Sequence, residues 1–246
     1  MADFLVFQLQ GVMASWGDIA VGEHRPSQGH PSKSAVLGLL AAALGIERQD
    51  DELHIRLDKQ LGFAVCVRAA GELLRDYHTI QVPAGKRDYA SRRDELLTDK
   101  LNLKTILSQR DYRMDAFYQV AIWCKQNNAN FTLDELQVAL KQPKYTLYLG
   151  RKSCPVNLPL NPVVLSDMNL KQVFDSYSLN NSQSLVDDFN NNALNSYYWE
   201  QGMLNDNEIG MTHSMSYPRR DQISSRKRWQ FANRDEFYYA EATREG

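Results

Sequence analysis

The segment from Tyr145 to Pro159 (YTLYLGRKSCPVNLP) combines aromatic rings, two adjacent cations and small polar groups, and it contains no acidic residue. Arg151 and Lys152 can neutralise phosphate oxygens. Tyr145 and Tyr148 offer ring faces to an unstacked base, and we expect one of them to be a core residue and Tyr148 to lie nearer the ligand. These residue types predict capture of a single-stranded nucleic-acid backbone.

A second segment, Arg25 to Ser34 (RPSQGHPSKS), has the same character and leads directly into the apolar run from Ala35 to Ile46. The pattern predicts a donor-rich loop that opens a buried helix over residues 34–44, capped by a serine and ended by a glycine. Free backbone N–H groups at a helix start attract anions. We therefore expect Arg25, Lys33 and Ser34 to contact phosphate.

The remaining elements must hold these two segments together. The sequence predicts strands at 4–9, 63–69, 72–80, 116–124 and 163–165, a tight turn at 70–71, a helix from the capping box Thr132 to Glu135, and a short helix at 169–177. Strand, helix, strand, insertion, strand, helix, strand is a split βαβ order. It predicts an α+β fold with a ferredoxin-like or RRM-like core. The insertion at 81–113 is basic, with eight cations against five acids.

Composition and charge limit the classes of protein to which this chain can belong. The chain has 246 residues with 43% hydrophobic content, which is enough for a substantial core, and its formal charge is −2. The local net charge differs from that total. It is +3 at 142–165 and +4 at 218–230, which we call the basic strips, and −6 at 166–211. The strips favour an anionic partner, although the whole chain is near neutral.

Other functional classes find little support. Cys66, Cys124 and Cys154 are odd in number and lack metal spacing, so we expect a reducing, cytoplasmic location and no cofactor. The longest apolar run has twelve residues, whereas a membrane helix needs about 20. Nucleotide-loop, nucleophile-elbow and zinc-protease motifs are absent from the sequence.

Four motifs resemble CRISPR-associated protein family five, in its type I-E branch. They are Y-x-x-Y-L-G-R-K-S-C-P at 145–155, P-S-K-S-x-x-L-G-L-L at 31–40, GVMASWG at 11–17 and RDYHT at 75–79. The likeness runs from Phe4 to about Tyr177 and returns from Arg219 to Tyr239. The stretch between them matches poorly.

The resemblance implies a non-catalytic Cascade subunit that grips the 5′ handle of the guide RNA (crRNA). It implies a palm at 1–80 and 114–246, with a C-terminal β-rich extension, and an inserted thumb at 81–113. The thumb would meet the backbone subunit (CasC), other faces would touch the large subunit (CasA), and target DNA would be met indirectly. The candidate RNA-binding residues are Arg25, His30, Lys33, Ser34, Tyr77, His78, Arg110, Tyr145, Tyr148, Arg151, Lys152 and Ser153.

Two alternatives stay open at this point. A metal-independent endoribonuclease that processes precursor crRNA could use Tyr77, His78 and Lys86, because imidazole can transfer protons near neutral pH. A protein-only scaffold would instead present its basic strips to acidic partner surfaces. The sequence does not decide whether the strip from Arg219 to Arg228 contacts RNA, DNA or protein, and it assigns no role to the Asn-rich segment at 180–195.

Overall fold

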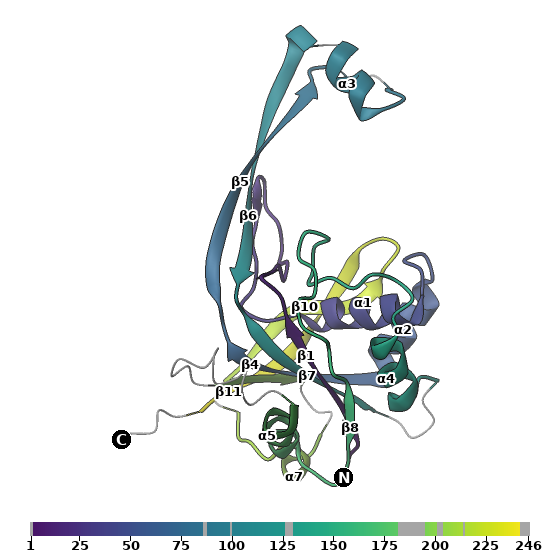
Figure 1. The fold of residues 1–246 in the computed structure, drawn as a ribbon, viewed down its shortest axis with the longest axis vertical. Helices are drawn as coiled ribbons and strands as arrows, with labels where there is room; N and C mark the ends of the chain where they lie inside the picture. The colour runs from purple at the N-terminus through teal and green to yellow at the C-terminus, as the bar shows by residue number, and fades with distance from the viewer. Residues whose placement is uncertain are drawn as a thin grey trace.

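The computed structural model describes residues 2–85, 88–98, 100–125, 130–181, 195–200, 204–213 and 215–241. Its body is a seven-stranded sheet in the order β10-β11-β9-β4-β7-β1-β8, in which all neighbouring strands run antiparallel (Figure 1). The strands are β1 (Phe4–Gln10), β4 (Leu61–Ala69), β7 (Phe117–Cys124), β8 (Val163–Leu165), β9 (Ser196–Glu200), β10 (Met215–Ser225) and β11 (Gln230–Ala240).

Helices cover both faces of this sheet, and strand β1, between β7 and β8, is buried along its whole length. Successive strand residues point to opposite faces, so Leu5 and Phe7 pack in one core and Phe4 and Val6 in another. The first core is covered by α1 (Lys33–Leu44), α2 (Asp51–Gln60) and α4 (Leu133–Lys141), and the second by α5 (Leu170–Asn181) and α7 (Asp206–Ile209). None of the helices in the described part of the chain is long and apolar enough to cross a bilayer.

Most of the predicted elements are confirmed, and the fold is mixed α+β. The cap of α1 is Ser32, whose hydroxyl accepts from the Ala35 N–H at 3.1 Å, and Gly45 ends the helix with φ 79°. The capping box of Thr132 and Glu135 is present. The neighbouring strands β4-β7-β1-β8 come from the predicted split βαβ segments, and the ferredoxin-like description of that core stays a prediction.

A long two-stranded ribbon projects from the body (Figure 1). Its strands β5 (Glu72–Pro83) and β6 (Leu103–Met114) pair along their full length, and α3 (Arg92–Thr98) and the short 3₁₀ helix η1 (Lys100–Asn102) lie at the far end. The short strands β2 (Met13–Ala14) and β3 (His24–Arg25) pair with the body end of β6.

The ribbon begins earlier than the predicted insertion, which starts at residue 81. The predicted turn at Ala70 and Gly71 exists, but it passes the chain from β4 in the main sheet to β5 in the ribbon. Gly71 has φ 65°, and a Cβ there would lie 2.2 Å from the Met114 carbonyl oxygen, so this transition requires glycine. The predicted C-terminal β extension joins the main sheet through β9. Most of the Asn-rich segment, at 182–194, lies outside the described residues.

Candidate nucleic-acid interface

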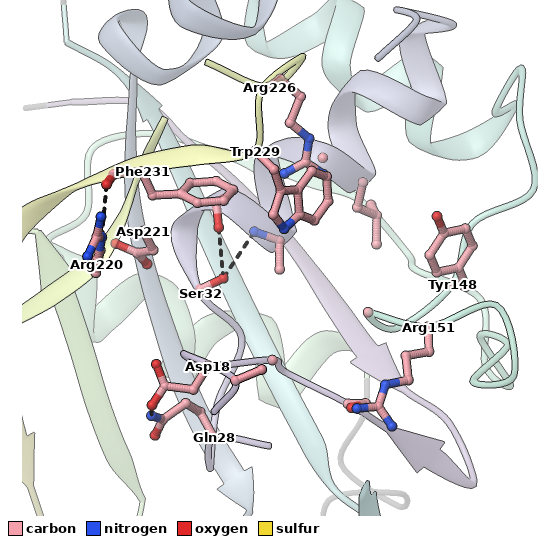
Figure 2. Close-up of a pocket in the computed structure, with 18 of the residues that line it drawn as sticks. Asp18, Gln28, Ser32, Tyr148, Arg151, Arg220, Asp221, Arg226, Trp229 and Phe231 are labelled. Carbon is pink, nitrogen blue, oxygen red and sulfur yellow. Dashed lines mark hydrogen bonds between the residues drawn. The ribbon is translucent and has the colours of Figure 1, made fainter. Parts of the chain in front are cut away.

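A cavity of about 590 Å³ lies between the start of α1 and the β10–β11 hairpin (Figure 2). Segments far apart in the sequence line it. They are the loop at 15–20, the first turns of α1, the loop at 146–151 and the hairpin residues Arg219, Arg220, Arg226, Trp229 and Phe231. The two segments predicted to bind phosphate thus share one cavity with the basic strip whose role the sequence left open.

Two buried side chains fix the loop that carries Arg151. Leu149 and Cys154 are fully buried, and the Leu149 N–H donates to the Cys154 carbonyl at 2.8 Å. The Ser15 N–H donates to the Leu149 carbonyl at 3.0 Å and ties this loop to the one at 15–20. Burial raises the pKa of the Cys154 thiol, which packs beneath the loop. The anchoring leaves Lys152 and Ser153 at the surface.

Gly150 is required for the loop to fold, and the structure explains why. Its φ is 84°, and a Cβ would lie 1.9 Å from the Ser15 carbonyl oxygen. The close approach that this glycine permits is to the protein's own backbone. Gly150→Ala should lower the free energy of unfolding by about 2–4 kcal/mol, because strain and a backbone clash add.

Thermal and denaturant unfolding measure that loss. Gly17→Ala is the matched control, since Gly17 lines the same cavity and a Cβ there meets nothing within 4 Å. If Gly150→Ala and Gly17→Ala unfolded at the same denaturant concentration, the described loop geometry would be wrong.

Arg151 has a donor that the protein leaves unused. Its guanidinium lies 4.8 Å from the centre of the Tyr112 ring, and Nη2 is 3.4 Å from the Arg25 carbonyl oxygen. Nη1 is buried and has no hydrogen-bond partner among the residues that the structure describes. A buried guanidinium N–H without an acceptor is costly, so this atom is suited to an anionic oxygen from outside the chain.

Arg25 touches Arg151 through its backbone carbonyl, and Arg110 is the direct Cα partner of Arg25 in the short parallel pairing of β3 with β6. The neighbouring Asp111 does not pair with Arg110. It accepts from Arg75 Nε at 2.8 Å and lies 3.1 Å from His24 Nε2, and these partners lower the pKa of its carboxyl group. Asp111 therefore does not give Arg110 a purely structural role, because its carboxylate pairs with Arg75 and His24 instead.

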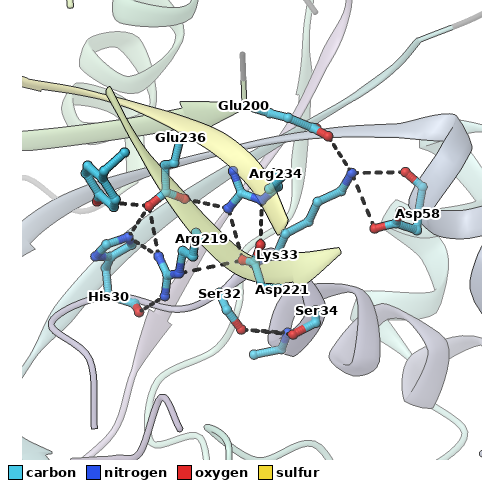
Figure 3. Close-up of polar contacts among 12 residues, drawn as sticks. His30, Ser32, Lys33, Ser34, Asp58, Glu200, Arg219, Asp221, Arg234 and Glu236 are labelled. Atoms are coloured by element: carbon cyan, nitrogen blue, oxygen red, sulfur yellow. Dashed lines mark hydrogen bonds and ion pairs between the residues drawn. The ribbon is translucent and has the colours of Figure 1, made fainter. Parts of the chain in front are cut away.

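Lys33 does not lie where the sequence predicts. Its side chain is fully buried, with Nζ 2.8 Å from Glu200 Oε1 and 3.0 Å from the Asp58 carbonyl oxygen (Figure 3). Its backbone N–H donates to Asp221 Oδ2 at 2.7 Å. A carboxylate of the protein therefore already occupies the start of α1, and the lysine serves the fold. The hydroxyl of Ser34 is 3.1 Å from that of Ser32, and Ser34 lines the cavity.

His30 is also buried, contrary to the prediction of an RNA contact. Its ring stacks on Tyr198 with centroids 3.7 Å apart, and Nε2 lies 2.9 Å from Glu236 Oε2. Burial and the nearby Arg219 lower the pKa of His30 to about 4. Arg234 adds hydrogen bonds to Asp221, including one of 2.6 Å from Nε, so the network joins the loop before α1 to the β10–β11 hairpin.

This network predicts loss of stability in acid. Unfolded His30 gains a proton below its ordinary pKa of 6.5, whereas the folded residue stays neutral down to about 4. The unfolded state binds more protons in this window, so the free energy of unfolding should fall by up to about 3 kcal/mol as pH drops through it. Urea unfolding at pH 7.0 and 4.5 measures the change.

His30→Gln should flatten that pH dependence, because glutamine does not titrate. Burial opposes ionisation of Glu236, but the contacts with His30 and Arg219 outweigh burial and lower the pKa of the Glu236 carboxyl group. The stabilising effect of the Glu236 carboxylate is therefore lost only at still lower pH. An equally steep pH dependence in His30→Gln would contradict this assignment.

The two tyrosines of the first motif are both partly exposed, so the expectation that one would be a core residue is wrong. Tyr148 is 39% exposed and lines the cavity, whereas Tyr145, at 47%, is not among the residues that line it. On the ribbon, Tyr77 and His78 are successive residues of β5 and point to opposite faces. His78 pairs with Asp76. Lys86 lies outside the described residues.

Sequence reasoning missed the contribution of the hairpin. Trp229 is 55% exposed, lines the cavity, and lies 4.3 Å from the Arg226 guanidinium. The signal was present, since this tryptophan lies within the basic strip at 218–230. Asp221 carried no such signal, because its contact with the start of α1 exists only in the folded chain.

The chain belongs to the CRISPR-associated protein (Cas_Cas5) family, whose model matches residues 4–235. A relative from Escherichia coli (strain K12), the CRISPR system Cascade subunit CasD, is 35% identical over 168 residues, which cover 65% of this chain and 70% of the relative.

Two solved structures are similar to this fold. One is a chain of a CRISPR RNA-guided surveillance complex, with a TM-score of 0.62, 23% identity, and coverage of 96% of this chain and 89% of that one. The other is a crystallised Cas protein, with a TM-score of 0.58, 25% identity, and coverage of 98% and 94%. At 23% identity, the chain of the surveillance complex supports only the similarity of the fold.

Proposed function

We propose that this chain is a Cascade subunit that holds the 5′ handle of the crRNA in the described cavity and its rim. The observation that carries the proposal is that Arg151 lines this cavity, with the Arg25 backbone in contact with it and Arg110 paired to Arg25 in the neighbouring strand. Membership in the Cas_Cas5 family and the likeness to a Cascade subunit support the proposed complex.

The three arginines would bind the sugar-phosphate chain, and the unpartnered Arg151 Nη1 would donate to a phosphate oxygen. Tyr148 would offer its exposed ring face to a base that is splayed from its neighbours, since single-stranded RNA is read through unstacked bases. The handle would be held by shape and charge, whereas pairing of the guide would supply recognition of the target.

The ribbon would serve assembly with partner subunits. Its two strands expose apolar side chains, including Leu73, Tyr77, Ile80 and Ile106. An exposed apolar surface of this kind is suited to a protein partner, and we assign it to the backbone subunit (CasC). Other faces would meet the large subunit (CasA), and contact with target DNA would be indirect, through the complex.

We assign no catalytic role to this subunit. In a nuclease that used Tyr77 and His78, both side chains would have to reach one phosphodiester, but they leave opposite faces of the ribbon. Incubating the purified protein with repeat RNA in the absence of metal should leave the RNA intact. Cleavage that is abolished by His78→Ala would overturn this assignment.

The proposed function is tested by titrating the full chain with a labelled RNA that carries the repeat-derived handle, at several salt concentrations. We expect binding to weaken steeply as salt rises, with a slope of log K against log salt of about −0.7 for each phosphate contacted. A duplex of the same sequence should bind more weakly, because its bases are stacked. Salt-insensitive RNA binding, with assembly that survives ribonuclease, would favour the protein-only scaffold.

A further inference from the structure

The turn of the β10–β11 hairpin holds two guanidinium groups on one indole. Arg226 Cζ lies 4.3 Å from the centre of the Trp229 ring, and Arg48 Cζ, from the loop between α1 and α2, lies 4.7 Å from it. Within the described part of the chain, neither guanidinium forms an ion pair with a carboxylate. Two like charges without a counterion repel each other, and an anion bound close to both would relieve that repulsion.

The fold makes specific room for Arg226. Gly38 lies within α1, where glycine costs about 0.5–1 kcal/mol relative to alanine. A Cβ at Gly38 would lie 2.8 Å from Arg226 Nη2, so the missing side chain leaves space for the guanidinium against the helix. Burial and the nearby Arg48 lower the pKa of Arg226.

The turn itself is held in place. Both carboxylate oxygens of Asp51, at the start of α2, accept hydrogen bonds from it: the Lys227 N–H at 2.7 Å and the Ser225 hydroxyl at 2.7 Å. Trp229 adopts a φ of 58°, which is uncommon for a bulky side chain. Despite this local strain, the indole is 55% exposed and lines the cavity. The side chain is thus presented at the surface by a clamped turn.

We propose that Arg226 and Arg48, held on the Trp229 indole, form a second phosphate site that takes one backbone phosphate of the crRNA on the hairpin side of the cavity. Arg151 lines the other side (Figure 2). This inference rests on the proposed function and names a further contact with the same RNA. Guanidinium groups suit the site, because their planar donors can stack on an aromatic face and still bind phosphate oxygens.

The test measures binding of the full chain to single-stranded handle RNA across a salt series. Arg48→Gln and Arg226→Gln should each weaken binding by about threefold to tenfold, and the double variant should make the slope of log K against log salt shallower by about 0.7. Arg226→Lys should retain the slope, because the charge remains. Gly38→Ala should weaken binding without removing a charge, because its Cβ displaces the guanidinium.

Lys171→Gln is the matched control, since Lys171 lies on α5, on the other face of the sheet, and should leave the slope unchanged. The melting temperature of every variant checks its folding. Acrylamide quenching of tryptophan fluorescence gives a second measurement, because Trp16, Trp123 and Trp199 are buried and Trp229 is exposed. Bound RNA should protect Trp229 from the quencher, whereas an unprotected Trp229 at saturating RNA would overturn the site.

The outcomes separate this site from the proposed function. If the folded double variant binds RNA with the wild-type slope while Arg151→Gln binds more weakly, the second site is wrong and the proposed function stands. If neither change affects RNA binding, both are wrong. If the double variant keeps its RNA affinity but the assembled complex loses affinity for target DNA, the site belongs to DNA and the inference is overturned.

Discussion

Lys33→Met is expected to lower the free energy of unfolding by about 3–5 kcal/mol, because it removes one partner of a buried charge cluster. Lys33 Nζ lies 2.8 Å from Glu200 Oε1 and 3.4 Å from Asp58 Oδ1, and all three side chains are buried. Glu200 retains Lys125 at 3.0 Å, but Asp58 would lose its ion pair. Denaturant unfolding measures the loss.

Two further variants make this prediction specific. Lys33→Met combined with Asp58→Asn should recover part of the stability, since the stranded carboxylate is then neutral. Arg56→Ala breaks an exposed i,i+4 pair with Glu52 and should change stability by less than about 1 kcal/mol. If Lys33→Met unfolded like the wild type and instead lost RNA affinity, Lys33 would contact the RNA as the sequence alone predicted.

Arg151→Glu is expected to weaken binding of handle RNA by about tenfold to a hundredfold at low salt, because it removes one phosphate contact and adds a repulsive charge. Stability should change much less than binding, because the Arg151 side chain is partly exposed and the hydrogen bond that it donates to the Arg25 carbonyl is long, at 3.4 Å. A filter-binding titration at two salt concentrations gives the affinities.

The expected effect depends on position and charge together. Arg56→Glu makes the same change of charge on α2, away from the residues that line the cavity, and should weaken binding far less. Arg151→Lys should retain part of the affinity, because the charge remains while the stacking on Tyr112 is lost. Equal loss in Arg151→Glu and Arg56→Glu would show only a general charge effect and would contradict the assigned contact.

Local patterns predicted much of the fold. Alternation in β1, the apolar run of α1 and the capping box before α4 all correspond to elements of the structure. These features are set by residues close together in the chain. The start of the ribbon was placed too late, because whether β5 pairs with β4 or with β6 depends on contacts between distant segments.

In the candidate site, too, the sequence predicted what nearby residues determine and missed what distant contacts determine. Arg151 and Tyr148 lie at the cavity because the loop that carries them is anchored locally by Leu149 and Cys154. Lys33 was misassigned, since its partners Asp58 and Glu200 come from elements remote in sequence. A lysine beside a helix start looks the same in the sequence whether its ammonium points outward or into a core.

The most direct test of the account is a crosslinking map of crRNA on this subunit in the assembled complex. We predict that handle nucleotides crosslink to Tyr148, Arg151 and the hairpin turn at 226–229, which line one cavity from separate segments. Lys33 and His30 should yield no crosslinks, because both are buried. Handle crosslinks found on the α5 and α7 face of the sheet, with none at the cavity, would contradict the account.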